Sequence, residues 1–139
     1  MRKESSYGIV PIRFDNGSPF VFFVKHKAGW WGFPKGHKEA QETDLEAASR
    51  ELLEETGLEV ESLLSENSFL ENYRFFRNNE WIEKAVYYFV ATVKNPDSIT
   101  VDGREVVEGK WAPLRDAERI LSFPESKEIV KEVRRSHTW

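Results

Sequence analysis

The feature that most constrains this chain is an acidic segment with the pattern of a single helix. Residues 39–59 contain eight acidic side chains and one basic side chain, Arg50. Thr43 and Glu46 have the spacing of a capping box, which begins a helix, and Gly57 is a typical residue just after a helix end. Between them, apolar residues recur at helical spacing at Leu45, Ala48 and Leu52. We therefore predict one amphipathic helix that begins after Thr43 and ends before Gly57.

Three glutamates of this helix share one face. Glu51, Glu54 and Glu55 stand at positions i, i+3 and i+4, so their carboxylates are within reach of one another. Like charges in this arrangement repel and destabilise an isolated helix. Hard divalent cations that take oxygen ligands, Mg²⁺ or Mn²⁺, would compensate for the repulsion. For the helix taken alone, a solvated charged face is the alternative interpretation.

An antiparallel hairpin is predicted before the helix. Two apolar runs, Tyr7–Arg13 and Phe20–Val24, flank a turn in which Asn16 and Gly17 favour the positive φ angles of a tight hairpin. Pro11 has no N–H to donate to a neighbouring strand. We therefore expect it at a sheet edge or in a bulge.

The remaining segments predict a loop, three more strands and two more helices. The loop is Ala28–Gly36, which holds three glycines, a proline and three aromatic residues. The expected strands are Phe69–Phe76 and Glu83–Val93, joined near Asn78 and Asn79, and a short one at Glu108–Trp111; the expected helices are about Leu114–Leu121 and Pro124–Arg135. The chain of 139 residues has no internal repeat or linker, so one domain is expected over residues 1–139.

The composition excludes several classes of function. The chain has no cysteine, which excludes a disulfide framework, a zinc-thiolate site and a thiol nucleophile. Its 20 basic and 24 acidic residues give a formal charge of −4, so no general basic field attracts nucleic acid or anionic lipid. The first residues lack the apolar core of a signal peptide, and no apolar run has the length of a membrane span. We expect a cytoplasmic protein with no DNA or membrane partner.

The acidic helix and the loop before it fit a longer motif. The segment Gly36–Leu58 matches G-x5-E-x7-R-E-U-x-E-E-x-G-U, where U is aliphatic, at all nine defined positions. The chance of this match is on the order of 10⁻⁹ per start position from average residue frequencies. This pattern is the Nudix box, so the sequence resembles the Nudix hydrolases. The resemblance implies an α+β fold in which a mixed sheet lies in an α/β/α sandwich, with the box as loop, helix and loop.

The resemblance also implies a set of site residues. Glu51, Glu54 and Glu55 would bind Mg²⁺, for which Mn²⁺ can substitute, and the Gly36 carbonyl would be a further oxygen ligand. Arg50 would orient the carboxylates and Glu42 would support the loop. Nudix substrates are nucleoside diphosphates linked to another group. Metal ions on the phosphates neutralise charge and activate the attacking water.

Residues before the box narrow the expected substrate. Trp31-Gly32-Phe33-Pro34-Lys35-Gly36-His37 is similar to the W-x-x-P-K-G-H signature of asymmetric dinucleoside tetraphosphate hydrolases. Lys35 adds a cation beside a polyphosphate, and His37 can donate to a phosphate oxygen or titrate near neutral pH. An exposed loop pair without function is the alternative.

Residues after the box extend the comparison. Lys84 precedes an apolar, aromatic run, as in the same subfamily, and is expected to bind phosphate. Glu105 lies six residues before Trp111, the spacing at which the family often carries an extra glutamate that binds metal or serves as base. Glu108 is the neighbouring alternative. Whether Glu105 or Glu51 accepts the proton from water stays open.

Recognition of adenine by stacking requires flat side chains near the phosphate site. Tyr73 and Tyr87 are the candidates, with Trp139 as a third, and a place in the core is the alternative for each. The function expected from all of these residues is magnesium-dependent cleavage of diadenosine tetraphosphate to ATP and AMP by a monomer or small homo-oligomer. The alternatives are removal of pyrophosphate from the 5′ end of RNA, another house-cleaning nucleotide pyrophosphatase activity, and nucleotide sensing without hydrolysis.

Overall fold

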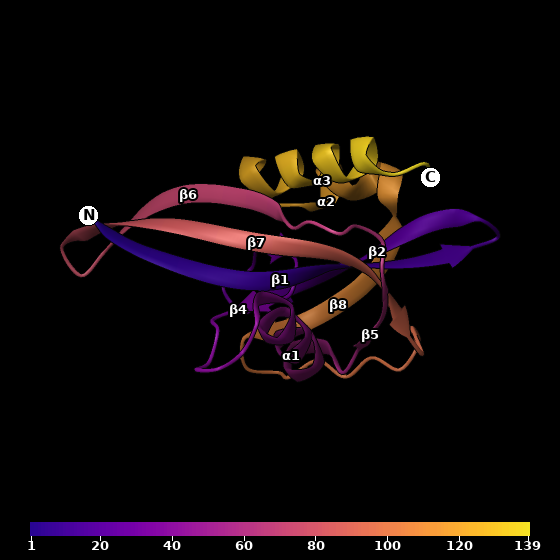
Figure 1. Cartoon of the computed structure of the whole chain (residues 1–139), viewed down its shortest axis with the longest axis horizontal. Coiled ribbons are helices and arrows are strands. Elements are labelled where there is room, and N and C mark those ends of the chain that lie inside the picture. The colour runs from indigo at the N-terminus through magenta and orange to yellow at the C-terminus, as the bar shows by residue number, and fades with distance from the viewer.

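Eight strands form one mixed sheet with α1 on one face and α2 and α3 on the other (Figure 1). The computed structural model describes all residues from 1 to 139. The strands are β1 Arg2–Asp15, β2 Ser18–His26, β3 Trp31–Gly32, β4 Lys35–Gly36, β5 Glu59–Leu63, β6 Phe69–Arg77, β7 Glu80–Lys94 and β8 Val106–Pro113. The helices are α1 Asp44–Thr56, the 3₁₀ turn η1 Leu114–Asp116, α2 Ala117–Ile120 and α3 Pro124–Ser136.

Strands β1 and β7 form the centre of the sheet and run parallel, with Arg2–Ile12 beside Ile82–Thr92. All other pairs are antiparallel. On its other side, β1 pairs first with β4 and then with β2, and β2 continues to β3 and β8. β7 pairs with β6 over its first half and with β5 near its end. The pairing of β4 with β1 places Lys35 and Gly36 at the middle of the sheet.

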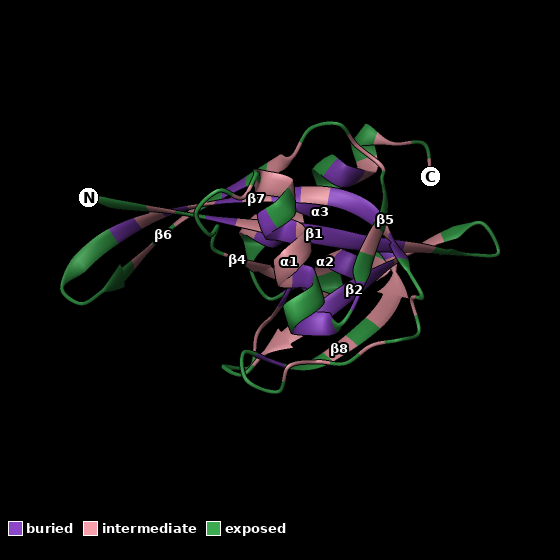
Figure 2. Ribbon diagram, turned by 60° about the horizontal axis from the view of Figure 1, so that its bottom comes forward, coloured by how far each residue is buried: buried purple, intermediate pink, exposed green.

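Alternating residues of the central strands supply two separate cores, one on each face of the sheet. Val10 and Ile12 belong to the cluster that includes Ile129 and Val133 of α3. Ile9 belongs to the opposite cluster, which includes Ala48 and Leu52 of α1, along with Phe22 of β2. Figure 2 shows these central strands as buried, whereas the far end of the β6–β7 hairpin is exposed. The predicted sandwich fold is confirmed.

The local signals at the predicted turns and caps are confirmed. Asn16 and Gly17 have φ angles of 51° and 80° in the turn between β1 and β2, and Asn78 and Asn79 have 52° and 63° between β6 and β7. Both contacts of the Thr43–Glu46 capping box are formed, and Gly57 ends α1 with a φ of 76°. These caps fix where α1 begins, and therefore where its glutamates lie.

Several expectations need correction. Pro11 lies inside the central strand β1, not at an edge; it falls between the residues that pair with β4 and those that pair with β2, where no neighbouring strand needs its N–H. The loop Ala28–Gly36 contains the two short strands β3 and β4. The segment Leu114–Leu121 is a 3₁₀ turn followed by a single turn of α-helix, and β5 was not foreseen. No helix of the chain is long and apolar enough to cross a membrane.

Candidate active site

A polar cavity of about 810 Å³ lies beside the acidic face of α1. No hydrophobic side chain lines it. Its walls come from four parts of the chain: the turn after β2, strand β4 with the segment after it, helix α1, and the segment before β8. The lining residues are Lys27, Gly36, His37, Lys38, Glu39, Arg50, Glu51, Glu54, Glu55, Asp102, Arg104 and Glu105. The fold therefore brings the acidic residues Glu51, Glu54, Glu55 and Glu105 to one cavity.

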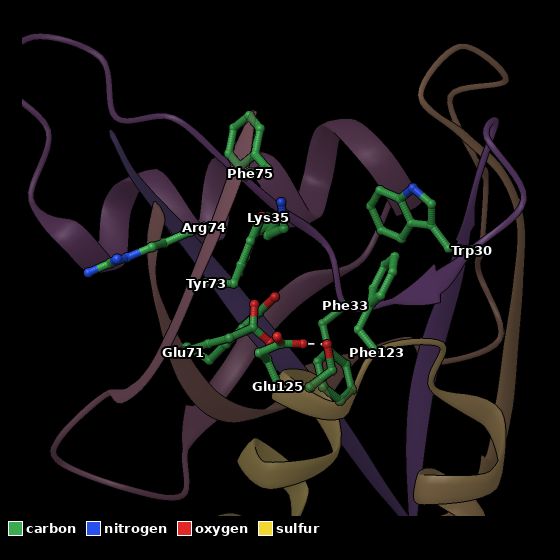
Figure 3. Close-up of a pocket in the computed structure, with 11 residues that line it drawn as sticks. Trp30, Phe33, Lys35, Glu71, Tyr73, Arg74, Phe75, Phe123 and Glu125 are labelled. Carbon is green, nitrogen blue, oxygen red and sulfur yellow. Dashed lines mark hydrogen bonds between the residues drawn. The ribbon is translucent and has the colours of Figure 1, made fainter. Parts of the chain in front are cut away.

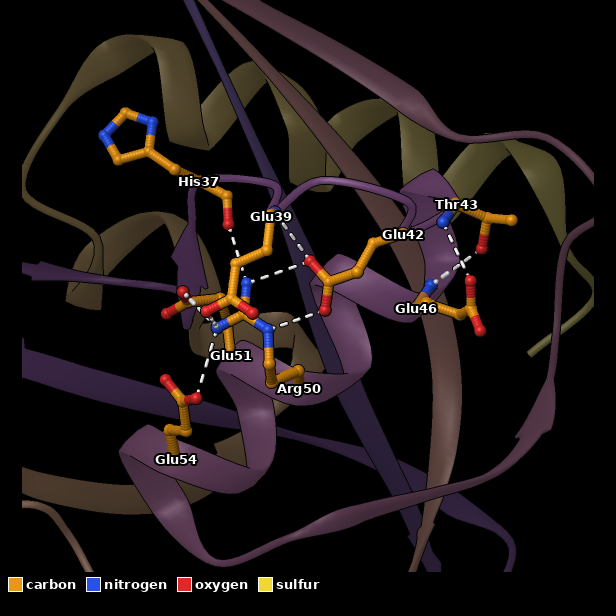
Figure 4. A network of polar contacts seen from close by, with 8 residues as sticks. All are labelled: His37, Glu39, Glu42, Thr43, Glu46, Arg50, Glu51 and Glu54. Atoms are coloured by element: carbon orange, nitrogen blue, oxygen red, sulfur yellow. Dashed lines mark hydrogen bonds and ion pairs between the residues drawn. The ribbon is translucent and has the colours of Figure 1, made fainter.

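Arg50 is the centre of the polar network at this cavity (Figure 4). Its Nε donates to Glu42 Oε2 over 2.7 Å, and its Nη2 donates to the His37 carbonyl over 2.8 Å. Its Nη1 donates to Glu51 at 3.0 Å and to Glu54 at 3.2 Å. Hydrogen bonds to these carboxylates, above all that of Glu42, raise the pKa of Arg50 above its ordinary range. One guanidinium thus joins the loop to the helix and holds two carboxylates on the same side.

Glu55 is buried beside this network. Glu55 is only 5% exposed, and its Oε2 has no hydrogen-bond partner. Burial raises the pKa of Glu55 to about 10, and the neighbouring carboxyl groups of Glu51 and Glu105 act in the same direction. A buried acid among other acids is therefore protonated in the metal-free protein, in a place where a cation would replace the proton.

The donor chemistry of the cavity fits a hard divalent cation, because every acidic ligand candidate offers oxygen. Gly36 lies against the Glu51 carboxylate, so that a Cβ at Gly36 would collide with this carboxylate and force it to move. In the present side-chain positions, no three acidic or histidine side chains are close enough together to hold a metal ion. Arg50 is hydrogen-bonded to both Glu51 and Glu54. Metal binding would therefore draw these carboxylates together.

The pKa of Glu55 leads to a prediction for stability. Between the ordinary value of 4.5 and about 10, the folded protein keeps a proton that the unfolded chain has lost. Its contribution to stability is therefore complete at low pH and is lost as the pH rises through this range. In EDTA, we expect the Tm to fall between about pH 5 and pH 9, and Mg²⁺ to restore it at the higher pH. Glu55→Gln should remove both effects, and an unchanged Mg²⁺ response in this variant would place the cation elsewhere.

The segment before β8 is built to present Glu105 to the cavity. Asp102 Oδ1 accepts backbone N–H groups from Arg104, Glu105 and Val106 at 2.9 to 3.1 Å. The Asp102 N–H donates to the Glu55 carbonyl at the end of α1 over 3.2 Å. Glu108, the alternative, lies in β8 opposite Lys25 of β2 and does not line the cavity. The geometry thus favours Glu105 as the additional carboxylate.

A second cavity, of about 470 Å³ and with mostly aromatic walls, lies on the α3 face of the sheet (Figure 3). Tyr73 lies here, opposite Trp30 from the loop before β3 and Phe123 from the segment before α3. The rings of Trp30 and Phe123 are 5.6 Å apart. The lining residues are Trp30, Phe33, Lys35, Glu71, Tyr73, Arg74, Phe75, Tyr88, Phe123, Glu125 and Ser126. Its volume is within the range of roughly 300 to 1,000 Å³ of small-molecule sites.

Lys35 lies where the two cavities approach each other, whereas Lys84, the other lysine expected to bind phosphate, lines neither cavity. Lys35 lines the aromatic cavity, and the next residue, Gly36, lines the acidic one. Lys84 is only 6% exposed, with its Nζ 3.9 Å from a Glu4 carboxylate oxygen. Burial, with a smaller contribution from Lys35, lowers the pKa of Lys84 to about 8. His37 is exposed at the acidic cavity, with its Nδ1 3.2 Å from the Ser5 carbonyl oxygen.

Two of the candidate aromatic residues lie elsewhere. Tyr87 stacks on Tyr7 at 5.6 Å, outside the aromatic cavity and on the opposite face of the sheet from Tyr73. Trp139 packs near Phe14 and lines a small cavity that shares no residue with the other two. Sequence reasoning missed Trp30, Glu71 and Phe123 in the aromatic cavity and Lys27 and Asp102 in the acidic one. Of these five residues, only Trp30 had a sequence signal for a place in a site, because it lies in a glycine-rich loop.

Comparison with known proteins now decides the family. A family model described as the NUDIX domain matches residues 2–133. The chain belongs to the Nudix family. Among curated relatives, the asymmetrical bis(5′-nucleosyl)-tetraphosphatase of Rattus norvegicus is 33% identical over 102 residues, which cover 73% of this chain and 68% of the relative. The corresponding enzyme of Caenorhabditis elegans is 31% identical over 101 residues, with 73% and 71% covered.

Solved Nudix structures share the fold. A binary complex of the C. elegans Ap4A hydrolase superposes with a TM-score of 0.72 at 24% identity, over 93% of each chain. The NUDIX domain of Shewanella oneidensis NrtR, complexed with ADP ribose, has a TM-score of 0.74 at 17% identity, over 99% of this chain and 90% of that one. At these identities the superpositions establish the architecture, and this Nudix chain is a hydrolase by family.

Proposed function

We propose that this Nudix protein is a Mg²⁺-dependent asymmetric hydrolase of dinucleoside polyphosphates, with diadenosine tetraphosphate cleaved to ATP and AMP. One observation carries the proposal: Lys35 lines the aromatic cavity while its neighbour Gly36 lines the acidic cavity. A nucleoside in the aromatic cavity can therefore extend its phosphates past Lys35 to the carboxylates of α1. The sequence relationship with the asymmetrical tetraphosphatases supports this substrate class.

The residues of the candidate site have separate roles in this proposal. Glu51, Glu54 and Glu55, with the Gly36 carbonyl, would hold the divalent cations, which when bound neutralise phosphate charge and lower the pKa of water. Arg50 positions Glu51 and Glu54 through its hydrogen bonds. Glu105, across the cavity, and Glu51 are the two groups that can take the proton from the attacking water. Lys35, Lys84 and His37 would bind phosphate oxygens.

The two halves of a dinucleotide meet different surroundings in this arrangement. One base enters the aromatic cavity, whereas the far end of the polyphosphate lies across the acidic cavity, which has no hydrophobic side chain in its lining. Water therefore attacks a phosphorus at a fixed distance from the bound base and not at the centre of a symmetric site. Asymmetric products follow from this placement.

A substrate panel tests the proposal against its alternatives. Purified protein with Mg²⁺ is expected to cleave diadenosine tetraphosphate with a higher kcat/KM than a short 5′-triphosphorylated RNA. A preference for the RNA would support pyrophosphate removal from transcripts. Tight nucleotide binding without any bond cleavage would support a sensor, although the complete set of box glutamates argues against it.

The aromatic cavity leads to a prediction for Tyr73. A base stacked on an aromatic ring is worth roughly 1 to 3 kcal/mol. Tyr73→Ala should therefore raise KM for the dinucleotide by about 5- to 150-fold with little change in kcat, since the ring is remote from the reacting phosphorus. Tyr73→Phe, which keeps the ring face, should change KM little.

Tyr87 provides the control on the opposite face of the sheet. It stacks on Tyr7 and lies outside the cavity. Tyr87→Ala should lower the Tm through lost packing and leave KM near the wild-type value. An unchanged KM in a folded Tyr73→Ala variant, or a larger KM effect in Tyr87→Ala, would remove Tyr73 from base binding.

A further inference from the structure

A buried acid with no part in the hydrolytic site lies in the aromatic cavity. Glu71, in β6, is 4% exposed and lines the cavity beside Phe33 and Tyr73. Ser126 Oγ, near the start of α3, donates to its Oε2 over 3.0 Å. This is the one hydrogen bond of the Glu71 side chain within the chain, so Oε1 and the second lone pair of Oε2 are left for another partner. Figure 3 shows Glu71 among the residues that line the cavity.

No arginine or lysine forms an ion pair with Glu71, although the residue is charged in its ordinary state. Burial raises the pKa of Glu71; the Ser126 hydrogen bond and the charge of Lys35 oppose this shift, and Glu125 adds to it. The other titratable groups that face the carboxyl are Tyr73 and Tyr88. A carboxyl that is buried among aromatic side chains, with no cation paired to it, is favoured in its neutral form. The neutral carboxyl presents one O–H donor and one carbonyl acceptor side by side.

This pair of groups matches one edge of adenine. The 6-amino group of adenine is a donor, and the adjacent ring nitrogen is an acceptor. Guanine has a carbonyl oxygen at the equivalent position next to an N–H, so its donor and acceptor are exchanged. Because Ser126 donates to Oε2, Oε2 is the acceptor and the proton of the neutral carboxyl lies on Oε1. With these places fixed, a base whose donor and acceptor are exchanged leaves buried polar groups unpaired.

We propose that Glu71 determines the base specificity of the aromatic cavity. Its carboxyl accepts a hydrogen bond from the 6-amino group of adenine and donates one to the adjacent ring nitrogen. Ser126 holds the carboxyl in place through Oε2. The inference rests on the proposed function in one respect, since it requires that a base occupy the aromatic cavity. It goes beyond that function because it names the base and the group that selects it.

Two substitutions at Glu71 test the assignment. Glu71→Gln keeps the shape and fixes a donor beside an acceptor, so the preference for adenine should persist. Glu71→Leu keeps a similar volume but removes both groups, so the preference should fall by about tenfold or more. Glu132→Gln, which removes an exposed carboxylate from α3, is the control for loss of one negative charge and should behave as wild type.

The readout is the ratio of dissociation constants for the non-hydrolysable β,γ-methylene analogues of ATP and GTP, measured by calorimetry. The ratio of kcat/KM for the diadenosine and diguanosine tetraphosphates is measured on the same proteins. Equal adenine preference in wild type and Glu71→Leu would overturn the assignment even if hydrolysis is intact. A gain in adenine preference in Glu71→Gln would also overturn it, since an ionised Glu71 would then be accepting from guanine. Selective binding of the ATP analogue without dinucleotide cleavage would contradict the proposed function and leave the role of Glu71 standing.

Discussion

Glu54→Gln is expected to lower kcat on diadenosine tetraphosphate by about 100-fold or more. The amide keeps the size of the side chain but removes one anionic ligand from the proposed metal site, and a 100-fold loss corresponds to about 2.7 kcal/mol of transition-state stabilisation. The side chain of Glu54 is 55% exposed, and its single ion pair is with Arg50 at 3.2 Å. We therefore expect the fold and the Tm to be retained. Steady-state kinetics in saturating Mg²⁺, with a thermal melt of the same sample, measure both quantities.

Glu59→Gln is the matched control for this substitution. Glu59 is an exposed glutamate of β5, just beyond Gly57, and it does not line the acidic cavity. Its replacement removes the same charge from the same region and should leave kcat unchanged. Near-normal turnover by Glu54→Gln, or an equal loss in both variants, would take Glu54 out of the metal site.

Gly36→Ala is expected to lower kcat/KM by about 10- to 100-fold, although it adds a single methyl group. Its φ is not in the left-handed region, so the backbone tolerates alanine. The new Cβ would instead collide with the Glu51 carboxylate and displace a proposed metal ligand. Overpacking of this kind typically destabilises by about 1 to 3 kcal/mol. Both the loss of activity and the lower stability should therefore appear in one variant.

The cause of the Gly36→Ala effect is testable by a double-mutant cycle. Glu51→Ala removes the carboxylate that the added methyl group would meet. In this background, Gly36→Ala should cost little stability, so the two free-energy changes should not add. Denaturant unfolding of the four proteins gives the coupling. Additive changes would mean that the methyl group acts through the backbone and not through Glu51.

The elements that the sequence predicts well are those with a strong local signal. The capping box and Gly57 define α1 within the residues expected, and the turns at Asn16 and Asn78 define two hairpins. Strand β5 was not foreseen because it is short, and four of its five residues are exposed, so no apolar alternation marks it. The prediction for Pro11 was wrong because a proline is also tolerated in the gap between two partner strands. This gap, between β4 and β2, exists only because β4 pairs with β1.

The acidic cavity was predictable because most of its residues lie on a single helix and the loop before it. The separation of Tyr73 from Tyr87 was also contained in the sequence. The turn at Asn78 and Asn79 sets Tyr73 opposite Lys84, and Tyr87 is three residues from Lys84. Side chains alternate along a strand, so Tyr87 points to the other face.

The aromatic cavity was not predictable from local patterns. Trp30, Glu71 and Phe123 lie in three segments separated by about 40 to 50 residues each, and only the packing of α3 against β6 brings them together. Both neighbours of Glu71 in its strand, Leu70 and Asn72, are exposed, so nothing marks it as a buried acid until α3 covers it.

Product analysis of diadenosine tetraphosphate cleavage tests the central claim most directly. The wild-type protein, incubated with the dinucleotide and Mg²⁺, is quenched early and its nucleotides are separated by ion-exchange chromatography. Attack at a phosphorus set by the base in the aromatic cavity predicts ATP and AMP in equal amounts from the first time point. Two molecules of ADP, or no nucleotide product at all, would contradict the account.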